Sequence, residues 1–341
     1  HSPEQPNHRA LRNDMTTSLE NEIDTKEDAL KIANDPEARE IADAYALLAR
    51  IYAGPRFTWE ESNFPENNMR TYQCLHDSIR RCSPIGTLQA LRINGTITPT
   101  VEKDMLISFD DAFRIVYDYA EQGDAFCQYI IGNVFFWRDD DRISLARDMI
   151  TPPRLSLAKR IQQSFQKGSI QERLIALQGT ISNETLQENA TKLAKEWFNK
   201  ALDNGLAMFQ GNLRNIYIDE GDFNNARRVA LTAAELGNPT MMLYTGLDCH
   251  EHGKFEDAFT WFTKGAALGQ AESTAELADY YYHFYDTKEL RRVIPYDPVK
   301  AIGLYRRAAT KYFSDAGYAA LQAAFGYIFH IGHLPLDWGL I

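Results

Sequence analysis

Small and apolar residues recur every 32 positions in the C-terminal half of the chain. The register is clearest in a column of alanines and a column of glycines, namely Ala194, Ala226 and Ala258, then Gly205, Gly237 and Gly269. Self-similarity at a fixed period of this length is typical of stacked helical units, because each unit buries its apolar face only against its neighbours. The pattern therefore predicts an all-α fold of stacked antiparallel helix pairs.

The first helix of each predicted pair carries a small residue, a large apolar residue six positions later and an aromatic residue at ten. Residues at such spacings share one face of a helix. Three copies follow the rule, at Ala125/Ile131/Phe135, Ala207/Leu213/Tyr217 and Ala271/Leu277/Tyr281. Two weaker copies follow it in part, at Pro239/Thr245/Cys249 and Asp315/Leu321/Phe325.

The second helix of each pair begins near an alanine, has small residues seven and eight positions later, and ends at a glycine. The copies at Ala226/Ala233/Ala234/Gly237 and Ala258/Gly265/Ala266/Gly269 are complete, and weaker ones start at Ala112 and Ala301. Small side chains let two helices approach closely. The final glycine accepts the left-handed conformation that ends a helix and reverses the chain.

The rest of the chain divides by composition. Residues 1–35 are polar and are expected to form a flexible arm, so that removing them should leave the melting temperature unchanged. Residues 36–104 are interpreted as divergent helical repeats or as a loop-rich cap. Residues 105–341 form the predicted repeat array, with insertions at 138–153 and 286–298. Insertions in such arrays fall in loops and often carry partner contacts.

The repeat columns resemble the Sel1-like repeat family, a relative of the tetratricopeptide repeat. Residues 258–269, Ala-Phe-Thr-Trp-Phe-Thr-Lys-Gly-Ala-Ala-Leu-Gly, carry the resemblance most clearly, and it extends over 190–285 and less closely over 105–137 and 298–326. The resemblance implies a right-handed superhelical α-solenoid that assembles protein complexes. It brings no shared catalytic residues.

Charge narrows the classes of partner. The 341-residue chain has a net charge of −11, and this argues against sequence-independent binding of the whole chain to nucleic acid or anionic lipid, although a local basic patch stays open. We expect a protein or peptide partner with basic character and salt-sensitive binding. No apolar run approaches the roughly 18 to 20 residues that span a bilayer, so membrane insertion is not expected. An intracellular location, in the cytosol or the mitochondrion, is favoured, with removal of a targeting segment as one explanation for the start at His1.

Candidate chemical motifs are weak. His250 and His252 are two positions apart and point to different faces of a helix, unlike a zinc-binding i, i+4 pair. The acidic run Asp139-Asp140-Asp141 is interpreted as hydrated loop residues in preference to a cation site. The cysteines contain no CxxC pair. Cys74 and Cys82 are eight positions apart, beyond disulfide reach on a helix, and are expected to be free thiols, whereas Cys249 is expected to be a buried structural thiol. We therefore expect no catalytic residue, no metal and no cofactor.

The residues favoured for partner contact lie on first helices. Five aromatic residues occur between Tyr280 and Tyr285, and one helix face cannot bury them all. Tyrosine supplies a large contact area with little loss of entropy. The expected contact residues are Tyr280, Tyr282, Tyr285, Tyr244, Asp248 and Asn215. Packing of the three C-terminal tyrosines under the 286–298 insertion is an equal alternative.

Taken together, these features predict a non-catalytic scaffold or adaptor that binds a partner through a groove lined by first helices. One alternative is a constitutive structural subunit of a large assembly, for example in the mitochondrion. A third option is an enzyme with an unrecognised site near the irregular segment 56–103.

Overall fold

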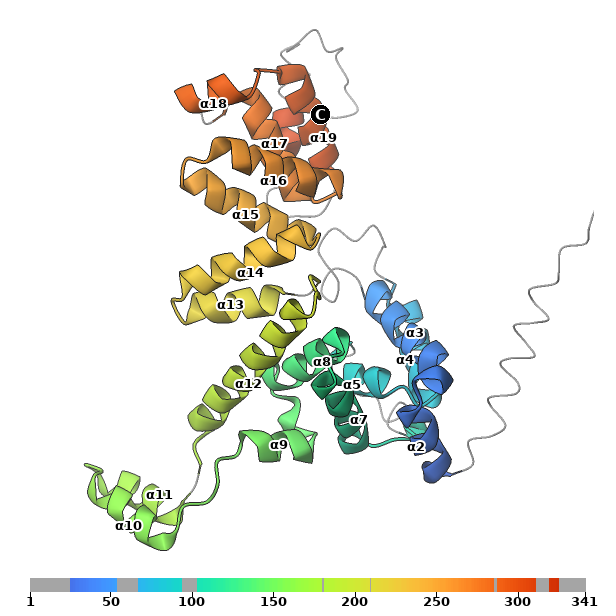
Figure 1. Ribbon diagram of the computed structural model, residues 1–341, viewed down its shortest axis with the longest axis vertical. Coiled ribbons are helices and arrows are strands. Elements are labelled where there is room, and N and C mark those ends of the chain that lie inside the picture. Colours follow the sequence, from blue (N-terminus) through green and yellow to red (C-terminus); the bar gives the residue numbers. More distant parts are fainter. Residues whose placement is uncertain are drawn as a thin grey trace, which may run out of the picture. The chain divides into compact units, whose positions relative to one another are not determined.

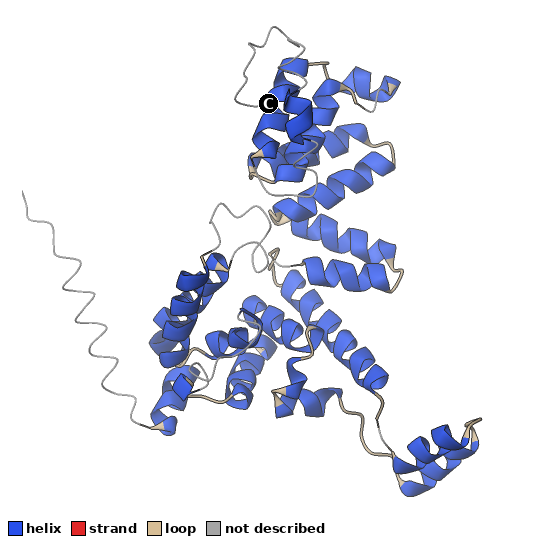
Figure 2. Cartoon of the chain, turned by 180° about the vertical axis from the view of Figure 1, so that it is seen from behind, coloured by secondary structure: helices blue, strands red, loops and turns tan. Residues whose placement is uncertain are grey.

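The computed structural model describes residues 25–53, 67–93, 103–179, 181–208, 210–284, 287–310 and 319–324. These residues form helices, turns and loops and contain no strand (Figure 2). The all-α fold expected from the repeat is therefore confirmed. The chain forms two compact units, residues 1–52 with 68–194, and residues 195–341 with 53–67. The division lies inside one helix, whereas the repeat array was predicted to begin at residue 105.

The first unit contains helices in the order of the chain (Figure 1). They are α2 (Lys26–Asn34), α3 (Pro36–Tyr52), α4 (Asn68–Arg80), α5 (Pro84–Ile93), α7 (Phe109–Glu121), α8 (Ala125–Phe136), the 3-10 helix η1 (Asp139–Asp141), α9 (Ser144–Ile150), α10 (Leu157–Phe165), α11 (Ile170–Gln178) and the start of α12 (Asn183–Asp203). Helix α5 packs against α3, α4, α7 and α8. The segment 36–104, which was interpreted as divergent repeats or a cap, thus contains α3, α4 and α5 among its described residues, and α5 is central to the unit.

Helix α2 corrects the expectation of a flexible arm up to residue 35. The Thr25 hydroxyl caps its start by accepting the Asp28 N–H at 3.1 Å. Ala29 and Ala33 are fully buried, and the Tyr119 hydroxyl donates to the Asn34 carbonyl at 2.9 Å. These two alanines bury one side of the short helix, which packs against α3 and α7. Because alanine side chains are small, they give only a weak hydrophobic pattern in the sequence. Residues 1–24 lie outside the described part of the chain.

The second unit is a succession of helix pairs. Its helices are the end of α12, α13 (Gly211–Asp219), α14 (Phe223–Glu235), α15 (Pro239–Glu251), α16 (Phe255–Ala267), α17 (Ala271–Tyr282), α18 (Lys288–Val293) and α19 (Pro298–Ala309). The pairs are α13 with α14, α15 with α16, and α17 with α19, and successive pairs pack through α14 on α15 and α16 on α17. The predicted helix pairs are confirmed. The insertion at 286–298 adds α18, which packs on α16.

Helix starts and turns follow the predicted local chemistry. The Asn238 side chain caps α15 by accepting the Met241 N–H, and Pro239 occupies its first turn. Left-handed backbone occurs at the predicted glycine column, Gly205, Gly237 and Gly269, and also at Gly123, Gly221 and Gly253. Helix α13 differs from the prediction, because it begins at Gly211 and not at Ala207. The Ala207 carbonyl instead accepts the Asn238 side-chain N–H at 2.8 Å, which ties the segment before α13 to the start of α15.

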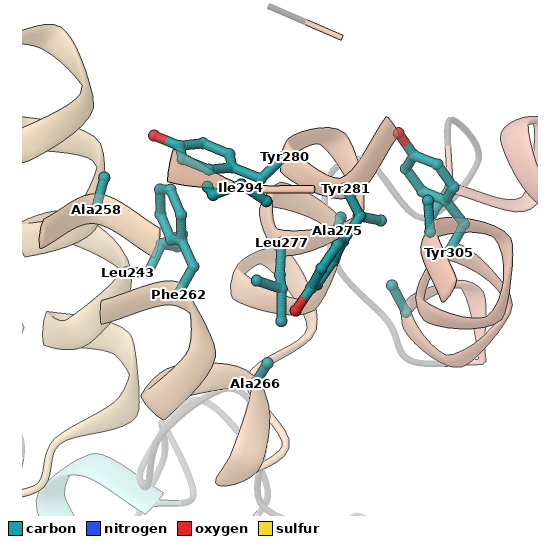
Figure 3. Packing of buried hydrophobic residues seen from close by; sticks show 14 of the residues in the cluster. Leu243, Ala258, Phe262, Ala266, Ala275, Leu277, Tyr280, Tyr281, Ile294 and Tyr305 are labelled. Atoms are coloured by element: carbon teal, nitrogen blue, oxygen red, sulfur yellow. The ribbon is translucent and has the colours of Figure 1, made fainter. Parts of the chain in front are cut away.

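The small-residue columns form the helix contacts of the second unit. Ala258, Ala266 and Ala278 belong to one buried cluster with Phe262 and Tyr280. Figure 3 shows the first two alanines and both rings. A Cβ atom added to Gly246 of α15 would lie 2.5 Å from the Phe262 ring of α16. Close approach of helices through small side chains, expected from the sequence, is therefore the way in which these pairs pack.

Candidate protein-binding surface

Arg214 of the first helix α13 contacts Tyr244 of the first helix α15, and we call the surface around these two residues the first-helix face. The guanidinium carbon of Arg214 lies 3.8 Å from the centre of the Tyr244 ring, a cation–π geometry. Burial lowers the pKa of Arg214 from its ordinary value, yet an arginine stays charged in proteins. Tyr244 is half-buried and Asn215 is exposed. The face thus presents one fixed aromatic ring with polar side chains beside it.

Asp248 extends this face along α15. Its Oδ1 atom lies 2.5 Å from Nε of Arg227 on α14. The His252 imidazole hydrogen-bonds to the Asp248 carbonyl oxygen at 2.7 Å. About a third of the Asp248 side chain is exposed (36%). Ion pairs with this degree of exposure contribute little to stability.

Tyr280 does not belong to this face, which corrects the expectation that it contacts a partner. Its side chain is fully buried, with its ring centre 5.5 Å from that of Phe262. The hydroxyl reaches Nδ1 of His250 at 2.7 Å. Tyr280 points toward α15 and α16, where a large side chain fills the space that their small residues leave. Burial raises its pKa above the ordinary value.

His250 is the polar partner inside this aromatic cluster. Its ring lies 5.4 Å from that of Phe255. Burial lowers the pKa of the His250 imidazole, so the neutral ring is favoured near neutral pH. His250 thus hydrogen-bonds across to α17, whereas the His252 ring bonds back to Asp248 of α15. Within the described residues, no group of three or more His, Cys, Asp or Glu side chains is placed to hold a metal ion.

Tyr282 packs against the insertion that follows it. Its ring centre lies 6.1 Å from that of Tyr296, and the His283 ring lies 5.4 Å from the same side chain. Tyr282 is half-buried and Tyr296 is 57% exposed. The sequence left open whether Tyr282 contacts a partner or packs under the 286–298 insertion. In the structure Tyr282 packs on the insertion and keeps part of its side chain accessible. Tyr285 lies outside the described residues.

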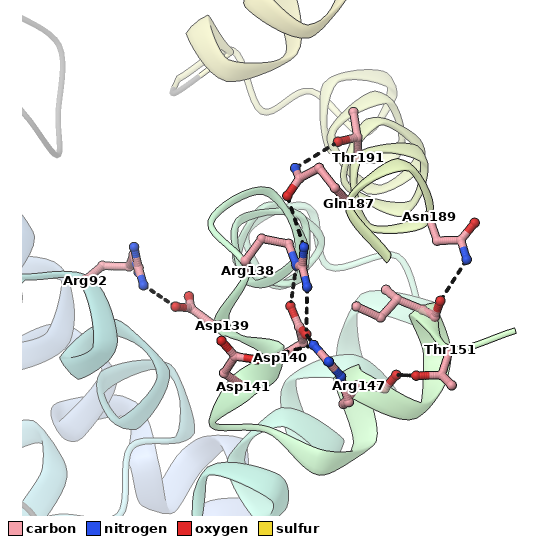
Figure 4. Close-up of polar contacts among 11 residues, drawn as sticks. Arg92, Arg138, Asp139, Asp140, Asp141, Arg147, Thr151, Gln187, Asn189 and Thr191 are labelled. Carbon is pink, nitrogen blue, oxygen red and sulfur yellow. Dashed lines mark hydrogen bonds and ion pairs between the residues drawn. The ribbon is translucent and has the colours of Figure 1, made fainter. Parts of the chain in front are cut away.

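Two residues of the acidic run in the first unit, Asp139 and Asp140, are buried, which corrects their interpretation as hydrated loop residues, whereas Asp141 is exposed. Asp139 and Asp140 have only 4% and 2% of their surface exposed. Arg92 pairs with Asp139. Asp140 accepts hydrogen bonds from Arg138 at 2.7 Å and from Arg147 at 2.5 Å (Figure 4).

The two buried carboxyls of this run differ in their acidity. Burial raises the pKa of Asp139 to about 6, because Arg92 offsets only part of the cost of removing the charge from water. Burial also favours a higher pKa for Asp140. The hydrogen bonds that Arg138 and Arg147 donate to this carboxylate outweigh the effect of burial and lower its pKa. Asp140 is therefore the charged centre of the cluster.

An open groove of about 650 Å³ lies between this cluster and the start of α12. Arg138 closes one side of it by donating to the Gln187 side chain at 3.0 Å. The lining mixes charges of both signs, namely Arg138, Asp141, Arg147, Asn183, Glu184, Gln187 and Glu188. The arginines already bind Asp140, so the groove holds no preformed anion site. Sequence reasoning missed this cluster, although the arginines that flank the acidic run were a signal for it.

The cysteines of the described chain are unpaired, as expected. Burial raises the pKa of the Cys82 thiol to about 11, which disfavours the reactive thiolate. Cys249 is half-buried, and burial also raises its pKa. No helix among the described residues is both long and apolar enough to cross a bilayer.

Comparisons with known proteins find no matching family model and no matching curated protein. Two solved structures are similar to this chain. A Sel1 repeat protein from Oxalobacter formigenes shares 16% identity, with coverage of 82% of this chain and 89% of that one and a TM-score of 0.37. The c5321 protective antigen of uropathogenic Escherichia coli, which displays an SLR fold, shares 14% identity over 90% of this chain, also with a TM-score of 0.37. The match spans 61% of the antigen's length.

Identities and TM-scores of this size give no information on function. The chain is an all-α protein whose second unit is built of stacked helix pairs.

Proposed function

We propose that this chain is a non-catalytic scaffold or adaptor that binds a partner protein or peptide through the first-helix face of its second unit. The observation that supports this function best is the arrangement of Arg214, Tyr244 and Asp248. These side chains are held by contacts within the array and keep part of their surface accessible. A fixed aromatic ring beside charged groups is typical of binding hot spots, since little side-chain entropy is lost on binding.

The chemistry of this face favours a partner segment with basic character. Asp248 is only partly neutralised by Arg227, and Asn215 adds an exposed amide. The chain as a whole has a net charge of −11, which attracts a basic segment at long range. Association should therefore weaken as salt is raised, and equal affinity at low and high salt would contradict this part of the proposal.

The test is quantitative affinity capture from extracts of the native cells, with the double variant Tyr244→Ala/Asp248→Ala. We expect loss of one or a few specific proteins by about tenfold or more, the size of a central hot spot. The matched control is Thr260→Ala/Thr263→Ala, two exposed positions on α16. It should retain the same proteins. Equal capture by both variants would show that the binding site lies elsewhere.

A structural subunit of a large assembly is the second candidate, and exposed apolar residues of α3 favour it. Ile41, Leu47 and Leu48 are 42%, 43% and 39% exposed. Side chains of this kind are often covered in permanent complexes. A salt wash during the capture experiment separates the candidates. An adaptor should lose its partners on washing, whereas a structural subunit should retain a complete set.

A further inference from the structure

Helices α10 and α11 form a hairpin that packs mainly on itself. Neither helix makes a substantial contact with any other described helix. Two hydrogen bonds to backbone carbonyls tie the hairpin together, from Arg160 to Gln178 at 3.3 Å and from Arg173 to Lys167 at 2.9 Å. Of the side chains described between residues 154 and 178, only Ser164 is buried. The hairpin is thus a preformed element whose described apolar side chains are not buried.

The apolar side chains of the hairpin are exposed to an unusual degree. They recur every four residues, at Leu157, Ile161 and Phe165 in α10 and at Ile170 and Leu174 in α11. Phe165 is 75% exposed and Ile170 is 78% exposed. These two residues flank the turn at 166–169, so the tip of the hairpin carries the most exposed large apolar groups of the described chain. Large exposed apolar groups clustered in this way mark a binding site.

The hairpin is basic, unlike the rest of the chain. Between residues 154 and 178 there are five basic side chains, Arg154, Lys159, Arg160, Lys167 and Arg173, and one acidic side chain, Glu172. The segment therefore has a charge of +4 in a chain whose total is −11, which leaves −15 on the remaining residues. Lys167 lies in the turn itself, between Phe165 and Ile170.

We infer that this hairpin docks on a bilayer surface that contains anionic lipids, with Phe165 and Ile170 in the interface and the basic side chains among the headgroups. Amphipathic helices with large apolar residues on one side and Lys or Arg on the other bind at this depth without spanning the membrane. Each helix has nine residues, far below the length of a span. This mode of binding is independent of the proposed first-helix face.

Two features favour a bilayer over a protein groove as the surface to which the hairpin binds. The apolar groups lie on both sides of a turn and end at its tip, and a fluid interface accommodates such a shape without a complementary surface. Lys167 fits there as well, because its aliphatic stem can lie along apolar neighbours while the ammonium group stays at the headgroups. The acidic charge elsewhere is screened beyond about 10 Å, so contact through the tip avoids most of the repulsion.

The test is flotation of the full chain with vesicles of phosphatidylcholine alone and with vesicles that also contain phosphatidylserine. We expect binding to the anionic vesicles, weaker binding in high salt, and little binding to the neutral ones. The variant Phe165→Ser/Ile170→Ser should bind the anionic vesicles at least about tenfold more weakly, since it removes two large apolar groups from the interface. Its matched control, Phe223→Ser/Leu268→Ser, changes two other residues that are 59% and 51% exposed and should bind normally.

A second pair of variants tests the charges. Lys159→Gln/Lys167→Gln should weaken binding, and Lys192→Gln/Lys254→Gln, two exposed lysines outside the hairpin, should not. Circular dichroism of each variant checks that the helices remain. Equal binding by the wild-type chain to neutral and anionic vesicles, or no binding to either, would overturn the inference. Self-association that depends on Phe165 and Ile170, without vesicle binding, would identify a second copy as the occupant and would also overturn it.

Discussion

At the scale of single residues, neighbouring aspartates have different roles. Asp139 and Asp140 are both buried, but burial dominates the pKa of Asp139, and hydrogen bonds from two arginines dominate that of Asp140. Near pH 7, Asp140→Asn should destabilise the chain by about 2 kcal/mol, because two charge-assisted hydrogen bonds are lost. Asp139→Asn should cost less than about 1 kcal/mol, since a neutral side chain suits that site. Urea denaturation of both variants gives the comparison, and equal losses would contradict it.

Two glycines inside helices give a second contrast between residues. Gly246→Ala should destabilise the second unit by about 1 to 3 kcal/mol, because the new Cβ atom would lie 2.5 Å from the buried Phe262 ring. Gly303→Ala in α19 is the matched control, with no atom within 4 Å of the added Cβ. It should be neutral or stabilise by up to about 1 kcal/mol, as alanine favours helix. Melting temperatures of the two variants measure the difference.

His250 makes the stability of the folded chain depend on pH, and the direction of this dependence follows from its pKa. Burial lowers its pKa in the folded state, so the unfolded chain takes up the proton more readily as pH falls. Its contribution to stability is present above the unfolded value, near 6.5, and is lost below it. The melting temperature of His250→Gln should therefore fall less than that of the wild-type chain between about pH 7.5 and about pH 5.5.

A parallel pH series with Asp139→Asn is the control for this experiment. The pKa of Asp139 is raised to about 6, so the stability that it contributes is lost as pH rises through that value, the opposite sign. Identical pH profiles for His250→Gln and the wild-type chain would show that the imidazole has no such role.

At the scale of elements, α2 is a structural part of the first unit. A chain that lacks residues 1–35 loses the buried Ala29 and Ala33 and the hydrogen bond from Tyr119. Its melting temperature should fall by several degrees, as expected for a loss of about 1 to 3 kcal/mol. Deletion of residues 1–24 is the control, because it keeps all of these contacts. Equal melting temperatures for the two deletions would mean that α2 adds no stability.

The elements also show what sequence reasoning found and what it missed. Columns such as Ala233, Ala234 and Gly237 encode a helix, its contact face and its end within a few residues, so the pairs were predictable. The environment of Asp139 was not predictable from the sequence, because it includes Arg92, which is 47 residues away. The burial of Tyr280 depends in the same way on which side chains of α15 and α16 surround it. The hairpin of α10 and α11 was not predicted, because its four-residue apolar spacing does not match the repeat columns.

At the scale of the whole molecule, the proposed binding functions lie on different parts of the chain. The first-helix face belongs to the second unit, and the basic hairpin belongs to the first. Tyr244→Ala/Asp248→Ala should therefore leave vesicle binding unchanged, and Phe165→Ser/Ile170→Ser should leave capture of the protein partner unchanged. Flotation and affinity capture with both variants check this independence. Loss of both activities in either variant would show that the two sites are coupled.

The insertion that holds α18 has a consequence for the order of folding. It separates α17 from α19 by 15 residues, whereas three residues join α13 to α14. Closing the longer loop costs roughly 1 kcal/mol more in chain entropy. Two hydrogen bonds across the insertion offset this entropy cost. Lys300 donates to the Tyr281 hydroxyl, and the Tyr305 hydroxyl donates to the Asp279 carboxylate. We therefore expect the α17/α19 pair to fold after its neighbours, by packing against the helices α15 and α16 that have already formed.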